Sequence, residues 1–545
     1  MEILKIENLT FSYPLCEEKA IDNISFSVDR GDFVTVCGPT GCGKSTLMRL
    51  LKKELIPLGE MSGKVYYKGR DVQTLSEKET ACSIGFVAQR PEEQIVTDKV
   101  WHELAFGLEN MGMPQDVIRR RVSEMTCYFG IEDWFEKSVS ELSGGQKQLL
   151  NLASVMVMQP DILILDEPTA QLDPIAASDF IATLSKLNRD LSLTVIITEH
   201  RLEEIIPVSN KLFAMERGKM LKYGETRETV KALRKNSVFM QGMPAAVRIF
   251  SSFDLSLPCP LTAREGREFI VKNFDNRVSK LETPLSNTEK KEAVLEFSDV
   301  YFKYSKEMPD VLRGLDFKVY KGEIFCILGG NGSGKSTCLS VAAGLRRQYS
   351  GTVRVLGKKI KDYKKNELYR GCISLLPQDV QTVFLKNTVR EELEDVVNKD
   401  HTLPYDLSEL NDRHPYDISG GQQQLLALAK VLSSAPQILL LDEPTKGLDA
   451  YAKKEIGVIL HKLAQTGLTV VCVTHDVEFA AEWADRCAMF FRGEITSCGI
   501  PSEFFAGNNF YTTAVNRMTS NYYKNITTVS DAVKIMRINM NGGAE

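Results

Sequence analysis

The sequence predicts an α/β protein made of two repeated domains. Three motifs each occur twice and in the same order: a glycine-rich loop of the form G-x-x-x-x-G-K-S, the run S-G-G-Q, and the run L-D-E-P-T. The second copies lie 291, 276 and 276 positions after the first. An ordered repeat at nearly constant offset indicates two homologous domains of a little over two hundred residues each.

The first motif of each repeat lies between a predicted strand and a predicted helix. The β-rich runs DFVTVCG and EIFCILGG enter GPTGCGKST at 38–46 and GGNGSGKST at 329–337, and helical patterns follow. This context is the one in which backbone N–H groups of the loop surround a polyphosphate. We expect Lys44 and Lys335 to neutralise phosphate oxygens, and Ser45 and Ser336 to ligate Mg²⁺.

The next element is an apolar run that ends in two acids, DILILDE at 161–167 and QILLLDE at 437–443. Such a run is typical of a strand buried on both faces of a parallel sheet, and ligands bind at the carboxyl ends of these strands. Asp166 and Asp442 are expected to hold Mg²⁺ through water, and Glu167 and Glu443 to polarise the attacking water. In the alternative interpretation these acids only cap the following turn.

The S-G-G-Q runs open helical patterns, QKQLLNLASVM and QQQLLALAKVL. Serine and two glycines at a helix start form an anion-binding end. A chain with two phosphate-loop lysines and two further anion-binding helix starts requires each of them to face a phosphate.

Together these blocks resemble the ATP-binding cassette (ABC) family over nearly the whole of both repeats. The resemblance implies two tandem P-loop NTPase domains, each with a mainly parallel core sheet, an antiparallel β-subdomain and a helical signature subdomain. It also implies that the cassettes pair head to tail, so that each ATP lies between one phosphate loop and the other cassette's signature. Site one would join Lys44 to the signature at 419–421, and site two would join Lys335 to that at 143–145.

The resemblance assigns further positions by residue. Tyr13 and Tyr304 match an aromatic that stacks on adenine, although an ordinary strand aromatic is the alternative. Gln89 and Gln378 match a glutamine that reaches Mg²⁺ and water, and Asp173 and Asp449 match the D-loop. The expected ATP-binding residues are Tyr13, Gly38, Pro39, Thr40, Gly41, Cys42, Gly43, Lys44, Ser45, Thr46, Tyr304, Gly329, Gly330, Asn331, Gly332, Ser333, Gly334, Lys335, Ser336 and Thr337. The signature residues are Ser143, Gly144, Gly145, Gln146, Ser419, Gly420, Gly421 and Gln422. The catalytic residues are Glu167, Glu443, His200, His475, Gln89 and Gln378, and the Mg²⁺ ligands are Ser45, Gln89, Asp166, Ser336, Gln378 and Asp442.

The motif spacing also predicts the domain limits. We expect a first cassette at 1–226, a connector at 227–292, a second cassette at 293–510 and a C-terminal appendage at 511–545 of unassigned role. The second copy lacks 13 residues between its glutamine and its signature, where the first copy has a predicted helical insert.

Composition and charge argue against several classes of function. The net charge of −5 gives no support to nucleic-acid binding, and no apolar run is long enough to span a membrane. The first residues lack the apolar core of a signal peptide, and the 12 cysteines show no zinc spacing. These features favour a cytosolic chain with reduced thiols.

The segments VAQRPEEQIV, ELAFGLEN, PLTAREGR and FFAGNNFYTTAVNRM are similar to the energy-coupling-factor ATPases. Gln94 matches that group's second glutamine, whereas the second copy has Val383. The resemblance implies an importer of vitamins or transition-metal ions, with ATP and Mg²⁺ bound and the chain peripheral on the cytoplasmic face of the cell membrane. Its partners would be integral membrane subunits and a small substrate-binding membrane protein. The alternatives are a soluble tandem ATPase that acts on ribosomes or nucleic acid, and a tandem sugar-importer ATPase.

Overall fold

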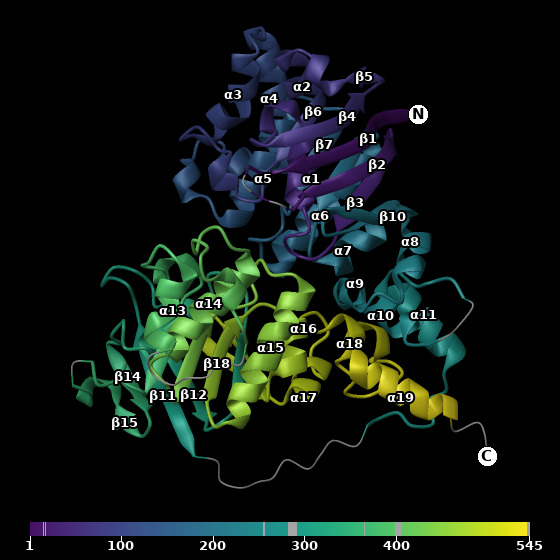
Figure 1. Cartoon of the computed structure of the whole chain (residues 1–545). Helices are drawn as coiled ribbons and strands as arrows, with labels where there is room; N and C mark the ends of the chain where they lie inside the picture. The colour runs from purple at the N-terminus through teal and green to yellow at the C-terminus, as the bar shows by residue number, and fades with distance from the viewer. Residues whose placement is uncertain are drawn as a thin grey trace. The chain divides into compact units, whose positions relative to one another are not determined.

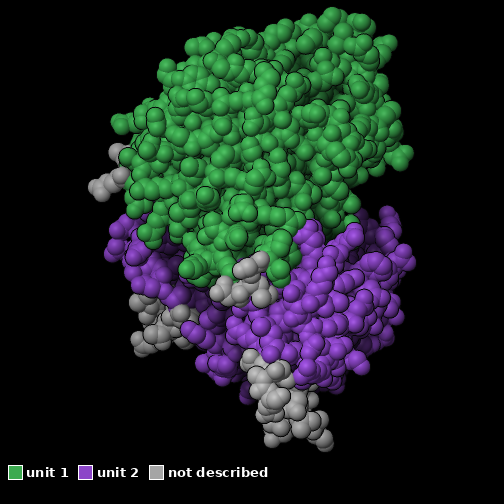
Figure 2. Space-filling model, turned by 90° about the vertical axis from the view of Figure 1, so that its right-hand side faces the viewer, with its two compact units in different colours: residues 1–247, 255–261 green, residues 248–254, 262–545 purple. Residues whose placement is uncertain are grey.

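The computed structural model describes residues 1–14, 16, 18–253, 257–281, 292–364, 366–397 and 405–541. Its internal contacts form two compact units, Met1–Val247 with Leu255–Leu261, and Arg248–Asp254 with Thr262–Glu545 (Figure 2). Each unit holds one copy of the repeat. The four-part division at 226, 292 and 510 stays a prediction. Residues 254–256 and 282–291 of the expected connector and 542–545 of the expected appendage lie outside the described residues.

The first unit contains a four-stranded antiparallel sheet and a six-stranded sheet (Figure 1). The strand order is β2-β1-β4-β5 in the smaller sheet and β10-β9-β3-β8-β7-β6 in the larger one, where only β10 is antiparallel. The strands are β1 (Glu2–Ser12), β2 (Ile21–Asp29), β3 (Phe33–Cys37), β4 (Glu60–Tyr67), β5 (Arg70–Asp71), β6 (Ile84–Val87), β7 (Ile162–Asp166), β8 (Thr194–Thr198), β9 (Lys211–Glu216) and β10 (Lys219–Glu225).

The second unit repeats both sheets in the same order, as β12-β11-β14-β15 and β16-β17-β18-β13-β19-β20. The strands are β11 (Ala293–Phe302), β12 (Leu312–Tyr320), β13 (Ile324–Leu328), β14 (Ser350–Val355), β15 (Lys358–Lys359), β16 (Ile373–Leu376), β17 (Ile438–Asp442), β18 (Thr469–Thr474), β19 (Arg486–Phe491) and β20 (Glu494–Gly499). Every residue of β7 and of β17 is buried, as their unbroken apolar runs predict. The predicted α/β class, with a parallel core and an antiparallel subdomain in each repeat, is confirmed.

The helices of the first unit include the predicted insert, which is the pair α3 and α4. They are α1 (Lys44–Leu50), α2 (Glu77–Ser83), α3 (Val100–Asn110), α4 (Gln115–Phe129), α5 (Gly144–Met156), α6 (Pro174–Leu191), α7 (Leu202–Ile205), α8 (Thr226–Leu233) and α9 (Ser237–Gly242). Helix α10 (Ala245–Ser251) crosses the boundary between the units. Those of the second unit are α11 (Ala263–Asn273), α12 (Lys335–Ala342), α13 (Val389–Val397), α14 (Gly420–Leu432), α15 (Ala450–Gln465), α16 (Val477–Trp483), α17 (Pro501–Ala506), α18 (Ala514–Thr519) and α19 (Val529–Asn541). No helix of the described chain is both long and apolar enough to cross a bilayer.

The C-terminal residues pack on the segment that precedes the second repeat. Helix α11 lies against α18, and the fully buried Tyr523 donates its hydroxyl to the Asp275 carbonyl at 2.8 Å. The side chain of Asn539 accepts from the Val278 N–H at 2.9 Å and donates to the Val278 carbonyl at 3.0 Å. Residues 262–281 and 511–541 thus form one helical module within the second unit; we call it the connector–tail module.

Candidate functional site

The two phosphate loops have matching backbone geometry. In the first unit β3 ends at Cys37 and α1 begins at Lys44; in the second, β13 ends at Leu328 and α12 begins at Lys335. The residue before each helix is a glycine with positive φ, 102° at Gly43 and 108° at Gly334. A side chain at Gly43 would lie 2.4 Å from the Ala20 carbonyl oxygen, so only glycine fits there.

The loop lysines are buried and point into their own loops. Lys44 Nζ donates to the carbonyls of Gly38 and Pro39 at 2.9 and 3.1 Å. Lys335 Nζ donates to those of Gly329 and Gly330 at 2.8 and 2.9 Å. An ammonium held in this way lies where backbone N–H groups and a helix N-terminus favour an anion.

A buried hydroxyl in the second loop supports a phosphate ligand. The Ser333 hydroxyl is buried and has no hydrogen-bond partner among the described residues. A buried hydroxyl without a partner is unfavourable, and a phosphate oxygen would accept its proton. The loop therefore fits a polyphosphate.

A serine and an aspartate meet beside each loop. Ser45 Oγ donates to Asp166 Oδ1 at 3.0 Å, and Ser336 Oγ donates to Asp442 Oδ1 at 3.0 Å. Burial raises the pKa of the Asp166 and Asp442 carboxyls, although the serine hydroxyls oppose this shift. Hydroxyl and carboxylate oxygens are the ligands that Mg²⁺ prefers, and a cation would offset the cost of burying the carboxylate. The pairs therefore fit Mg²⁺.

The glutamates after β7 and β17 each bond to the predicted histidine. Glu167 Oε1 lies 2.7 Å from His200 Nε2, and Gln89 Nε2 donates to Glu167 Oε2 at 2.9 Å. Glu443 Oε2 lies 2.9 Å from His475 Nδ1. Both glutamates have positive φ, 45° and 51°, which is a strained conformation for a residue with a side chain. Strain of this kind is often found at functional sites.

Within the described residues, the second site lacks the glutamine–glutamate hydrogen bond that the first site has. Gln378 is exposed, and within the described chain its side chain makes no hydrogen bond, whereas Gln89 bonds Glu167. Instead Lys335 Nζ lies 3.9 Å from Glu443 Oε1. The structure thus brings the predicted glutamine, glutamate and histidine together in the first unit, but only the glutamate and histidine in the second.

The signature residues begin helices as predicted. Ser143 caps α5 and Ser419 caps α14, and each forms a capping box with the glutamine three residues later, Gln146 or Gln422. The N-terminal N–H groups of both helices are held in place for an anion.

The D-loop aspartates are also caps. Asp173 accepts from the Ala176 N–H at 2.9 Å at the start of α6, and Asp449 accepts from the Ala452 N–H at 2.8 Å at the start of α15. This cap fixes each D-loop to the helix that follows it.

The two tyrosines lie just after a strand and not within one. The hydroxyl of Tyr13 is 3.0 Å from Thr46 Oγ1, and that of Tyr304 is 2.8 Å from Thr337 Oγ1. The Tyr304 ring is half exposed, and the Arg346 guanidinium lies 4.6 Å from its centroid. Each hydroxyl therefore contacts the phosphate-loop helix of its unit, and the adenine-stacking role of the two rings stays a prediction.

The structure adds residues that the sequence analysis did not select. Thr198 Oγ1 donates to Asp166 Oδ1 at 2.8 Å and accepts from the Glu167 N–H at 2.9 Å. The next residue, Glu199, is almost fully buried beside His200. Comparing the two repeats could have found them, since TEHR at 198–201 stands where the second copy has VTHD at 473–476.

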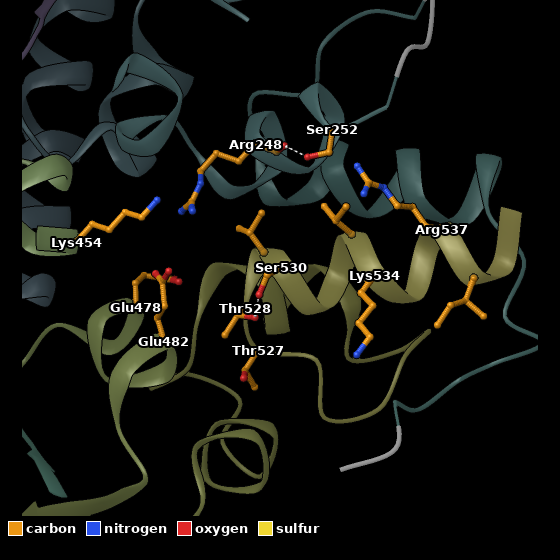
Figure 3. A pocket seen from close by; sticks show the side chains of 13 residues that line it. Arg248, Ser252, Lys454, Glu478, Glu482, Thr527, Thr528, Ser530, Lys534 and Arg537 are labelled. Atoms are coloured by element: carbon orange, nitrogen blue, oxygen red, sulfur yellow. Dashed lines mark hydrogen bonds between the residues drawn. The ribbon is translucent and has the colours of Figure 1, made fainter. Parts of the chain in front are cut away.

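A separate recess of about 660 Å³ lies in the second unit, between α10, α15, α16 and α19 (Figure 3). Arg248 and Lys454 point into its centre from two helices, beside Glu478. Lys534 and Arg537 point to different sides of α19. The four cations therefore do not all face one point of the recess.

Comparisons with known proteins show which family the chain is similar to. The ABC transporter family model matches residues 21–170 and 312–446. A protein from Bacillus thuringiensis, provisionally named as an ABC transporter ATP-binding protein, is 40% identical over 94% of each chain. One from Streptomyces coelicolor with the same provisional name is 32% identical over 95% of this chain and 97% of its own. The solved structure of cbiO1 from Clostridium perfringens, part of the ABC transporter complex cbiONQ, is 31% identical with a TM-score of 0.39, and it covers 43% of this chain and 96% of that one.

Proposed function

The chain belongs to the ABC transporter family, and we propose that this ATPase powers a membrane importer of the energy-coupling-factor type. One observation carries the catalytic part of the proposal. Each unit gathers a phosphate-loop lysine, a serine–aspartate pair and a glutamate–histidine pair at the carboxyl ends of its parallel strands. This is the set of groups that ATP hydrolysis needs.

The proposed reaction transfers the γ-phosphoryl group of ATP to water and releases ADP and phosphate. Lys44 and Lys335 bind the phosphates. Ser45 with Asp166, and Ser336 with Asp442, would hold Mg²⁺, which when bound neutralises charge on the phosphates.

Glu167 and Glu443 orient the attacking water and accept its proton at a carboxylate oxygen. His200 and His475 hold these carboxylates in position and are placed to contact the γ-phosphate. A positioned general base contributes about 10² to 10⁴ in rate.

We propose that the two cassettes complete each other's sites. Site one joins Lys44 to the signature at 419–421, and site two joins Lys335 to the signature at 143–145. Bound ATP then stabilises a closed pair, hydrolysis removes the stabilising contacts, and this differential affinity drives motion.

The importer type rests on sequence segments and on the loop that follows Gln89. Gln94 shapes this loop: its Oε1 accepts from the Ala88 N–H at 2.9 Å and from Asn151 at 3.1 Å, and its Nε2 donates to the Phe86 carbonyl at 2.9 Å. The second copy has Val383 at this place and cannot form the same bonds. We infer that the two cassettes present different loops to the membrane partner.

The proposed partners are integral membrane subunits and a small substrate-binding membrane protein, at the cytoplasmic face of the cell membrane. The cargo class is a vitamin or a transition-metal ion. The names of the relatives as ABC transporter ATP-binding proteins support a membrane partner.

The test is to purify the tagged full chain from detergent-solubilised membranes of its own host and to identify what accompanies it. We expect a stoichiometric integral membrane protein. The side chain of Val96 on the loop is 67% exposed, so Val96→Glu should reduce this recovery, whereas Leu191→Glu, at a 57% exposed position on α6, should not. Recovery with ribosomes and without a membrane protein would refute the importer, and recovery with a sugar permease would refute the energy-coupling-factor type.

A further inference from the structure

Residues 198–201 of the first unit connect His200, which matches the switch histidine of the ABC family, to the D-loop before Asp173. Each of the four side chains contacts a different part of segment 166–172. The pairs are Thr198 with Asp166, Glu199 with Thr169, His200 with Glu167, and Arg201 with Leu172. The segment that carries the histidine is therefore bonded along its length to the segment that carries the catalytic glutamate.

Glu199 is the least expected member of this set. Glu199 is only 3% exposed, and this burial raises the pKa of its carboxyl. Its Oε1 accepts from the Thr169 N–H at 3.0 Å and from Thr169 Oγ1 at 2.6 Å, and its Oε2 accepts from the His200 N–H at 3.1 Å. A buried carboxylate is tolerated when its oxygens accept several hydrogen bonds, and here those bonds join the two segments.

Arg201 extends the connection to the D-loop. Its Nη2 donates to the Leu172 carbonyl at 2.9 Å, one residue before Asp173. Because Asp173 caps α6, the arginine joins the histidine segment to the loop and to the start of that helix.

The second cassette is connected differently. Thr474 stands in place of Glu199, and its hydroxyl accepts from the Asp476 N–H at 3.0 Å. Asp476, in place of Arg201, forms an ion pair with Lys453 of α15 at 2.6 Å. The first cassette has Ala177 at the position of Lys453, so it cannot form this pair. Glu199 and Arg201 thus connect the histidine segment of the first cassette to the D-loop region, where the second cassette uses the Asp476–Lys453 ion pair.

We propose that Glu199 and Arg201 are positioning residues that make the switch histidine and the D-loop of the first cassette move as one body. This inference rests on the proposed role of His200 in hydrolysis. A displacement of the D-loop is transmitted through Thr169 and Leu172 to the backbone of His200, and so to its bond with Glu167. Loss of the connection lowers turnover but leaves the phosphate loop, and hence ATP binding, intact.

The test compares Glu199→Gln, Glu199→Thr and Arg201→Met in the full chain by ATPase kinetics and by equilibrium binding of ATP. Glutamine can still accept from Thr169 but presents an N–H group to the His200 N–H, whereas threonine is the residue of the second copy. We expect kcat to fall about fivefold or more in Glu199→Thr and Arg201→Met and by less in Glu199→Gln, with KM and the ATP affinity changed less than twofold.

Two controls separate positioning from general stability. Asp32→Asn removes another buried carboxylate of the same unit, at the opposite end of β3, and should lower the melting temperature while kcat stays within twofold. A double-mutant cycle between Glu199→Thr and Thr169→Val should give a combined kcat loss smaller than the product of the single losses, because both changes remove the Glu199–Thr169 side-chain contact.

The outcomes are distinct. A folded Glu199→Thr variant with wild-type kcat, or a variant whose only change is a raised KM, overturns this inference. If Glu199→Thr does not fold, Arg201→Met decides by the same criteria. Failure of the proposed function appears separately, as turnover that survives loss of Glu167 and Glu443.

Discussion

Replacing both proposed water-activating glutamates, Glu167 and Glu443, by glutamine should trap ATP without turnover. Glutamine has almost the shape of glutamate and can keep the contacts of Glu167 with Gln89 and His200, and of Glu443 with His475. It cannot accept a proton from water. Since a general base contributes about 10² to 10⁴, each altered site should retain about 1% of its turnover or less.

The single variants measure how much each of the two sites contributes to ATP turnover. With two equal and independent sites, Glu167→Gln or Glu443→Gln alone should leave about half of the wild-type kcat, and the double variant about 1% or less. If hydrolysis at one site requires hydrolysis at the other, the kcat of each single variant falls nearly as far as that of the double variant. An unaffected Glu443→Gln variant would make the second site regulatory.

The assay is steady-state phosphate release, together with retention of radiolabelled ATP after rapid gel filtration. The exposed changes Glu77→Gln and Glu409→Gln are matched controls for the two units and should leave both readouts unchanged. Wild-type phosphate release by the double variant would show that these glutamates are not the water-activating groups.

Three further predictions follow from the same geometry. Lys44→Ala and Lys335→Ala each remove a charged contact to phosphate worth about 1.5 to 3 kcal/mol, so ATP affinity at the altered site should fall about 10- to 150-fold by calorimetry. Tyr523→Phe removes the hydroxyl that donates to the Asp275 carbonyl, at a cost of about 0.5 to 1.5 kcal/mol, and hydrogen exchange should show lost protection in residues 262–281 while the first unit is unchanged. Burial alone would raise the pKa of Asp476, but the Lys453 ammonium holds the pKa at about 2, below the ordinary value of 3.8. The pair therefore contributes about 2 kcal/mol above pH 4, and this stability is lost as the pH falls towards 2. The melting-temperature difference between wild type and Asp476→Asn should accordingly be full at pH 7 and shrink below pH 4; a constant difference would contradict the ion pair.

Much of the fold and of the motif chemistry could be predicted from the sequence, because local physics dominates there. The phosphate loops need glycine at Gly43 and Gly334, and the all-apolar runs of β7 and β17 allow only a strand buried on both faces. These requirements can be recognised in a short stretch of sequence. Each stretch occurs twice in the chain, and this repetition identified the two α/β domains.

The rest depended on contacts between distant parts of the chain. Glu199 looks like a solvated acid in TEHR until the fold places Thr169, thirty positions earlier, against its carboxylate. The same holds for Gln378, whose sequence context matches that of Gln89 but whose side chain has no partner among the described residues. The roles of the site residues and the domain limits stay predictions.

The connector–tail module has a consequence for biosynthesis. Residues 262–281 leave the ribosome about 230 positions before their partners at 511–541 begin to appear. At about 5 to 20 residues per second, the face of α11 that packs on α18 must wait on the order of 10 to 50 s for its cover. The nascent chain therefore exposes an apolar surface until α18 is released, and a premature stop before Ala514 would leave that surface open to chaperones and proteases.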